Sequence, residues 1–263
     1  THEHVTEVVL RGPGKGNAMG PDFWRECPLV FEALDADPDV RAIILRGDGG
    51  NFTYGLDLRA MMADLGPLSG GEMLASERTK FLAKVRELQR AADAIEKCRK
   101  PVICAISGWC IGGGVDIAAA CDIRLATKHA KLSVREVKVA MVADLGSLQR
   151  LPRIIGQGVT RELAFTGDDV DGSEALRIGL VNRVYENDVE LLEGARDLAR
   201  RIAKNPPLVV QGIKEVLGYC ADKSVSDGKN FVAVWNAAFL ASHDLTEALS
   251  AFVEKRPAKF AGK

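Results

Sequence analysis

A glycine-rich turn is the first feature of this chain that could support chemistry. Residues 107–114 read Ser-Gly-Trp-Cys-Ile-Gly-Gly-Gly, between an apolar strand and a helical stretch that begins at Val115. Backbone N–H groups in the first turn of a helix lack intrahelical acceptors, and glycine lets a ligand approach the backbone closely. Such a turn suits a phosphate, a carboxylate or a developing oxyanion. The alternative is a turn that only permits tight packing of strand on helix.

Three carboxylates follow this turn at Asp116, Glu136 and Asp144. Carboxyl groups in different environments can divide the tasks of a general acid and a general base. Each also has a purely structural interpretation. Asp116 would complement the helix dipole, Glu136 between Arg135 and Lys138 would be a solvated surface charge, and Asp144 would cap the next helix. The residue types alone leave both interpretations open.

Signatures of cofactors and metals are missing from the sequence. It contains neither G-x-G-x-x-G nor G-x-x-x-x-G-K-[ST], so dinucleotide and nucleoside-triphosphate sites lose their main support. The four histidines have no metal-ligand or triad spacing. The six cysteines include no C-x-x-C pair and mostly lie in apolar stretches, so we expect free thiols and no metal site.

Composition and charge limit the partners. The chain has 263 residues with 35 Lys+Arg against 36 Asp+Glu, a net charge of −1. This balance gives no overall field for attracting nucleic acid or an anionic membrane. No apolar run approaches the ~18–20 residues of a membrane helix, and the first residues lack the order of a signal peptide. We expect no nucleic-acid or membrane partner and a cytoplasmic location.

The elements that must position these residues alternate between β-branched runs and helical periodicity, which indicates an α/β fold. Apolar residues at three- and four-residue steps predict a long helix over Gly71–Lys97. Pro28 within the helical stretch Asp22–Leu34 should kink or restart that helix. The predicted strands are Val5–Leu10, Val40–Arg46, Val102–Ser107, Ile123–Thr127 and Lys131–Val134.

The C-terminal quarter is predicted to be helical. Beyond Asp188 two apolar stripes are separated by Asn205-Pro206-Pro207. The stretches Asp227–Ser242 and Leu245–Glu254 carry more apolar surface than a peripheral helix needs. Packing onto the core or onto a neighbouring subunit would bury that surface.

Six short sequence motifs occur in order along nearly the whole chain: Gly16–Met19, Phe52–Asp57, Lys100–Gly108, Gly112–Asp116, Cys121–Arg124 and Phe252–Pro257. Together they resemble the crotonase, or enoyl-CoA hydratase/isomerase, superfamily. The resemblance implies a spiral of ββα repeats over residues 1–200, carrying an acyl-CoA site. It also implies a helical C-terminal region over 201–263 that packs and trimerises, giving a homotrimer or homohexamer.

The same resemblance assigns the binding residues. The backbone N–H groups of Leu56 and Gly113 would stabilise the enolate oxygen of an acyl-CoA thioester. Tyr54 stands where the family mostly has Ser or Ala, and its ring should narrow the pocket. Asp57 also has a structural interpretation, in which it orders its own loop. The lysines of the C-terminal tail have one as well, in which they belong to a solvated chain end. The implied substrate-binding residues are Tyr54, Gly55, Asp57, Gly112, Lys255 and Lys259.

The order Asp116, Glu136, Asp144 resembles the Δ3,5-Δ2,4-dienoyl-CoA isomerases. Hydratases of the family have Glu at the first two positions and a small residue at the third. The implied reaction converts 3,5-dienoyl-CoA to 2,4-dienoyl-CoA in fatty acid β-oxidation, with Asp144 favoured as base and Glu136 as acid. No cofactor is needed, because coenzyme A is part of the substrate and the double-bond shift is redox-neutral.

Two alternatives remain at this point. One is another reaction of the family, an enoyl-CoA hydratase or a Δ3-Δ2-enoyl-CoA isomerase. The other is a non-catalytic protein, since some hydratase homologues bind RNA through lysine-rich helices. The balanced charge and the lack of a basic helix argue against the RNA-binding alternative.

Overall fold

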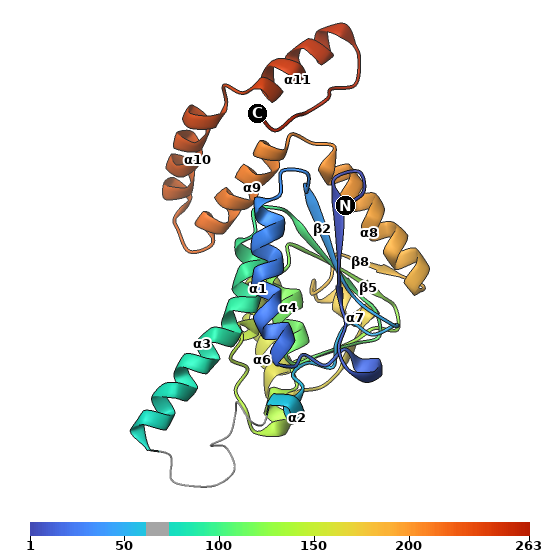
Figure 1. The fold of residues 1–263 in the computed structure, drawn as a ribbon, viewed down its shortest axis with the longest axis vertical. Coiled ribbons are helices and arrows are strands. Elements are labelled where there is room, and N and C mark those ends of the chain that lie inside the picture. The colour runs from blue at the N-terminus through green and yellow to red at the C-terminus, as the bar shows by residue number, and fades with distance from the viewer. Residues whose placement is uncertain (62–73) are drawn as a thin grey trace.

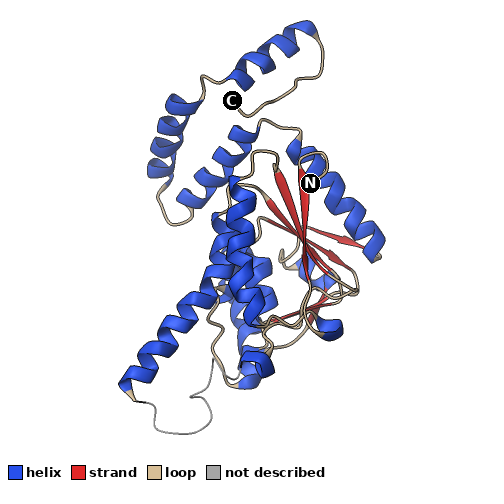
Figure 2. Cartoon of the chain, in the orientation of Figure 1, coloured by secondary structure: helices blue, strands red, loops and turns tan. Residues whose placement is uncertain are grey.

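A parallel five-stranded sheet lies at the centre of the chain (Figures 1 and 2). The computed structural model describes residues 1–61 and 74–263. In spatial order the strands are β1 (Val5–Leu10), β2 (Ala42–Gly47), β3 (Val102–Ile106), β5 (Ile123–Thr127) and β8 (Arg183–Tyr185).

A second sheet has three short strands, β4 (Trp109–Ile111), β6 (Lys131–Ser133) and β7 (Val170–Asp171). Strand β4 follows β3 directly in sequence, and β6 likewise follows β5. Each of these pairs therefore places its first strand in the large sheet and its second strand in the small one. A helix, α4 (Gly113–Ala120), completes the first pair as a ββα unit, as the sequence predicted.

Helices cover both faces of the large sheet. Helix α8 (Asp188–Ala203) packs on one face, where Ala195 and Ala199 contact Ile44 and Ile103 in a small apolar cluster. The other face is covered by α1 (Pro21–Ala36), α3 (Ala75–Lys97) and α4 (Figure 1). Because neither face of β3 or of residues Ala42–Leu45 in β2 meets water, these stretches are continuous apolar runs rather than alternating ones.

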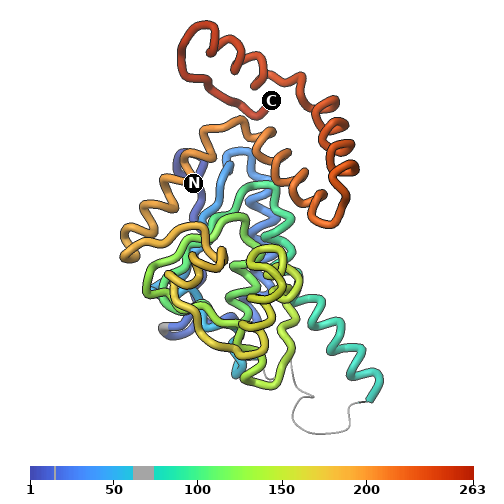
Figure 3. The backbone as a smooth tube through the Cα atoms, turned by 180° about the vertical axis from the view of Figure 1, so that it is seen from behind, coloured from blue at the N-terminus to red at the C-terminus, as the bar shows by residue number. Residues whose placement is uncertain are grey.

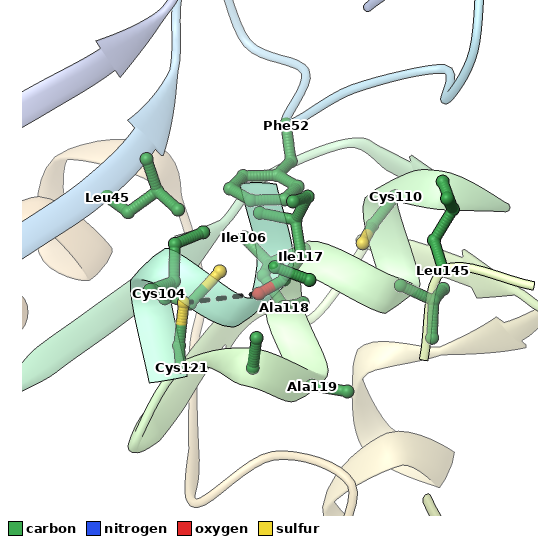
Figure 4. Close-up of a cluster of buried hydrophobic side chains, with 14 of the residues drawn as sticks. Leu45, Phe52, Cys104, Ile106, Cys110, Ile117, Ala118, Ala119, Cys121 and Leu145 are labelled. Carbon is green, nitrogen blue, oxygen red and sulfur yellow. Dashed lines mark hydrogen bonds between the residues drawn. The ribbon is translucent and has the colours of Figure 1, made fainter. Parts of the chain in front are cut away.

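The core beneath α4 is especially well shielded. All eight residues of α4 are buried. Figure 4 shows Ile117 on this helix near Phe52, and Cys121, which directly follows the helix, near Cys104. All six cysteines carry free thiols. Burial raises the pKa of the Cys98 thiol to about 11, which makes it a poor nucleophile. The thiols thus act as small apolar side chains.

The predicted strands and the predicted helices are present in the structure, with ends that differ by a few residues. The short strands β4, β7 and β8 and the helices α5 and α6 were not predicted. Helix α1 continues through Pro28, which is buried in the core. The first residues of the predicted long helix, 71–73, lie outside the described part of the chain.

Helices α9 (Pro207–Cys220), α10 (Val225–Phe239) and α11 (His243–Glu254) extend beyond the sheet (Figures 1 and 3). No helix in the described ranges is long and apolar enough to span a membrane. The remaining helices are α2 (Leu58–Met61), α5 (Ser147–Ile154), α6 (Gly156–Thr166) and α7 (Gly172–Arg177), with 3₁₀ turns η1 (Gly14–Gly16) and η3 (Glu136–Val139).

Candidate active site

The loop that carries Gly55 runs beside the glycine turn at the start of α4. Thr53 N–H donates to Trp109 O at 2.9 Å, and Ile111 N–H donates to Thr53 O at 3.1 Å. A Cβ added at Gly55, where φ is +84°, would lie 2.5 Å from Ile111 O and 3.5 Å from Gly113 N. Glycine at 55 is therefore what lets the two segments approach.

The backbone N–H groups of Leu56 and Gly113 are available at this junction. On either side of Leu56, Met19 N–H donates to Gly55 O and Asp57 N–H donates to Met19 O. Within the described chain, neither Leu56 N–H nor Gly113 N–H has a hydrogen-bond acceptor. Both residues line the same cavity, so both N–H groups can serve a developing oxyanion there.

The cavity has a volume of about 780 Å³, within the usual range for small-molecule sites. Two of the predicted acids, Glu136 and Asp144, line it together with Tyr54, Gly55 and Gly112. The rest of the wall is mostly apolar and suits a hydrocarbon chain. The apolar lining residues are Leu58, Phe81, Val85, Leu88, Trp109, Ile111, Val139, Met141, Val142 and Leu145.

Glu136 lies at the start of η3 and faces the glycine turn. Its Oε1 would be 3.2 Å from a Cβ at Gly112, where φ is +53°. Its Oε2 is buried with no hydrogen-bond partner among the described residues. Burial, together with the neighbouring Asp116 and Asp144 carboxylates, raises the pKa of Glu136 to about 7.

Asp116 lies behind this wall, in the first turn of α4. Its side chain is buried, and Oδ1 accepts a hydrogen bond from Ser147 N–H at the start of α5. Burial raises the pKa of Asp116 to about 6, although the Ser147 hydrogen bond opposes that shift. Asp116 does not line the cavity, so its influence on a substrate would pass through Glu136.

Asp144 occupies the loop before α5. Gln89 on α3 donates through Nε2 to the Asp144 main-chain O at 2.7 Å. Partial burial raises the pKa of the Asp144 carboxyl above its ordinary value. Unlike Asp116, Asp144 is exposed to the cavity and can reach a bound molecule directly.

Tyr54 lines the cavity beside Trp109. A Cβ at Gly16 would lie 2.4 Å from the Tyr54 ring, and the ring meets Trp109 edge-on at 6.4 Å between centroids. The Arg135 guanidinium lies 5.4 Å from the Trp109 ring and pairs with Asp169. The sequence did not predict Trp109 or Arg135 as site residues, although Trp109 lies within the glycine-rich turn and Arg135 directly precedes Glu136.

Three predicted binding residues lie elsewhere. Asp57 caps α2, its Oδ1 accepting from Ala60 N–H at 3.0 Å, and it lines a different cavity beside α1. This geometry matches its structural interpretation. Lys255 ends α11, and Lys259 N–H donates to Glu247. Helix α11 lies at the opposite end of the molecule from α2 (Figure 1), so neither lysine reaches the cavity within one chain.

A metal centre is not suggested by the described residues. Among them, no group of three or more His, Cys, Asp or Glu side chains is arranged to hold a metal ion.

The enoyl-CoA hydratase/isomerase family model matches residues 1–263. The chain belongs to this family. It is 44% identical over 96% of its length to the mitochondrial Δ(3,5)-Δ(2,4)-dienoyl-CoA isomerase of Dictyostelium discoideum, covering 86% of that protein. It is 43% identical to the peroxisomal enzyme of the same name from Arabidopsis thaliana, covering 99% of this chain and 94% of that one.

The crotonase-type fold predicted from the sequence is confirmed by a solved structure. The crystal structure of enoyl-CoA hydratase from Bacillus anthracis superposes with a TM-score of 0.88 at 29% identity, covering 99% of this chain and 96% of that one. Hydratases and isomerases thus share this architecture, and the fold by itself does not select the reaction.

The predicted cytoplasmic location is wrong. The relatives named above are a mitochondrial and a peroxisomal protein. Balanced charge and the lack of a signal-peptide pattern carry no information about delivery to an organelle, which explains the error.

Proposed function

We propose that this protein is a Δ3,5-Δ2,4-dienoyl-CoA isomerase acting on unsaturated fatty acyl thioesters in β-oxidation. The observation that carries the proposal is that Glu136 and Asp144 line one cavity with the Leu56 and Gly113 amides. The names of the similar proteins support this reaction over the hydratase alternative.

The thioester oxygen would accept hydrogen bonds from Leu56 N–H and Gly113 N–H. Asp144 takes a proton from the α carbon, and the electron pair of that C–H bond moves into a dienolate whose charge reaches the oxygen. Losing one oxyanion donor costs ~3–4 kcal/mol in comparable sites. Glu136 then gives a proton to the far carbon of the diene, so one C–H bond breaks and another forms.

The protonation states suit this division of tasks. With a pKa of about 7, a substantial fraction of Glu136 is protonated at neutral pH and can donate. Asp116, in contact with Ser147 N–H, supplies a neighbouring negative charge that keeps this pKa high. No redox cofactor or metal enters the scheme, since the product is an isomer of the substrate.

The test compares two substrates with one purified protein. The protein is incubated with 3,5-dienoyl-CoA and, separately, with trans-2-enoyl-CoA, and the ultraviolet bands of both acyl groups are followed. We expect turnover of the dienoyl substrate, and a loss of at least a hundredfold in Asp144→Asn. Hydration of the enoyl substrate as the faster reaction, or full dienoyl turnover by Asp144→Asn, would overturn the proposal.

We also propose that the protein assembles as a homotrimer or homohexamer and binds neither nucleic acid nor membranes. Exposed apolar side chains on the C-terminal helices support assembly, including Ile213 and Leu217 on α9 and Phe252 on α11. The proposed role of Lys255 and Lys259 in binding coenzyme A would then require a tail from another copy.

A further inference from the structure

We propose that Arg150 on α5 and Gln89 on α3 are positioning residues that hold the segment 144–147, and with it both the Asp144 and Asp116 carboxyls. This inference rests on the proposed function, because it assigns these residues a role in the same reaction. Neither residue lines the cavity, so each would act through the segment it binds.

The Arg150 guanidinium lies against the backbone of Leu145 and Gly146 in this segment. Its Nη1 donates to Leu145 O at 3.4 Å, and a Cβ at Gly146 would lie 1.8 Å from the same nitrogen. Gly146 has a φ of +120°, so the chain turns around the guanidinium at a position where only glycine fits. The path of the backbone between Asp144 and Ser147 is thus matched to an arginine.

The guanidinium is itself fixed from the opposite side. Arg150 Nη2 bonds to Glu96 at 2.6 Å and to Asp93 at 3.1 Å, both on α3. The Arg150 side chain is 11% exposed, so these ion pairs are partly shielded from solvent. Such pairs are worth more than surface pairs and hold α5 against α3.

Gln89, one turn earlier on α3, completes the arrangement. Its Nε2 bonds directly to the Asp144 main-chain O, while Ser147 N–H at the other end of the segment bonds to Asp116. The backbone of Asp144 and the side chain of Asp116 are therefore both bound to one short segment, which α3 holds through Gln89 and Arg150.

Charge gives Arg150 a second effect. Among the described residues, the titratable groups that interact electrostatically with Asp116 are Asp144, Glu136, the Cys110 thiol and Arg150, and of these four only Arg150 is a cation. Removing that cation leaves Asp93 and Glu96 without their partner. Both changes favour the protonated form of Asp116, so the part of the pH profile that depends on the Asp116 charge should move toward higher pH.

The experiment uses the full-length protein with 3,5-dienoyl-CoA and measures kcat and KM across pH for Gln89→Leu, Arg150→Met and Arg150→Lys. Arg90→Met is the matched control, because Arg90 is an exposed residue of α3 whose ion pair with Glu32 lies outside this network. Melting temperatures show that each variant is folded at the assay temperature.

We expect Gln89→Leu to lower kcat about tenfold, with KM within about twofold and the pH profile unmoved. Arg150→Met should lower kcat and move the acid limb upward by about half a pH unit, while Arg150→Lys keeps the limb in place because it keeps the charge.

The outcomes separate this inference from the proposed function. A wild-type protein without dienoyl turnover means that the proposed function has failed. Wild-type turnover with Gln89→Leu matching Arg90→Met in kcat would overturn the positioning role. If the acid limb of the pH profile lies at the same pH in Arg150→Met and Arg150→Lys, the proposed electrostatic effect is overturned.

Discussion

Glu136 shows how a single residue can be costly for stability and useful for chemistry. One of its oxygens is buried without a partner in the described chain, and burial raises its pKa to about 7. A folded-state pKa above the unfolded value means that stability is lost as the pH rises through it. The same shift supplies a carboxylic acid at neutral pH.

Glu136→Gln should therefore raise the free energy of unfolding at pH 8 by about 2–3 kcal/mol and abolish proton delivery. Glutamine keeps the shape but does not ionise, whereas Glu136 must ionise between its ordinary pKa of 4.5 and about 7. Denaturant unfolding at pH 4 and pH 8 measures the effect. The gain in the free energy of unfolding should vanish at pH 4. An equal gain at both pH values would contradict the raised pKa that burial gives Glu136.

Sequence reasoning found the site residues whose role depends on type and motif, and it missed those whose role depends on packing. Recognisable sequence motifs contain Gly113, Glu136 and Asp144, and in the structure these three residues line one cavity. The contact of Arg135 with Trp109 joins two segments that are far apart in the sequence, and no local sequence pattern predicts such a contact. The raised pKa values are likewise a result of burial.

At the scale of elements, the site depends on the register between the 53–55 loop and β4. The hydrogen bonds of Thr53 to Trp109 and Ile111 align these two segments of the chain and bring Leu56 beside Gly113. Strand β4 is only three residues long and was not predicted, so the sequence could name both amides without giving the pairing that joins them.

Gly55→Ala tests this register. The added methyl group would overlap Ile111 O and separate the two segments, so we expect kcat to fall by about a hundredfold or more. Gly49→Ala is the control, because Gly49 has a similar φ of +67° but no atom within 4 Å of its Cβ position. It should share the backbone strain and keep kcat. Equal kcat values for the two variants would exclude a role for the register.

At the scale of the whole molecule, the C-terminal helices carry unpartnered apolar surface. Between α9, α10 and α11 lies a cavity of about 310 Å³ whose lining is largely apolar. Side chains such as Leu217 and Leu249 are 67% and 61% exposed. Helix α8, in contrast, packs an apolar stripe that includes Leu191, Ala195 and Ala199 against the sheet.

Light scattering should give the mass of a trimer or hexamer for the purified protein. Leu217→Glu should shift the population toward monomer while retaining the helical circular dichroism, because a charge cannot be buried unpaired in a subunit contact. Lys229→Glu, on an exposed position of α10, serves as the control. A monomeric wild-type protein would refute the proposed assembly.

The central claim is that acid and base act at opposite ends of a bound diene, and turnover of 3,5-dienoyl-CoA in deuterium oxide tests it most directly. Magnetic resonance of the 2,4-dienoyl product should show one solvent-derived deuterium at carbon 6, the end remote from the thioester. Deuterium confined to carbons 2 and 4, or a hydroxylated product, would contradict it.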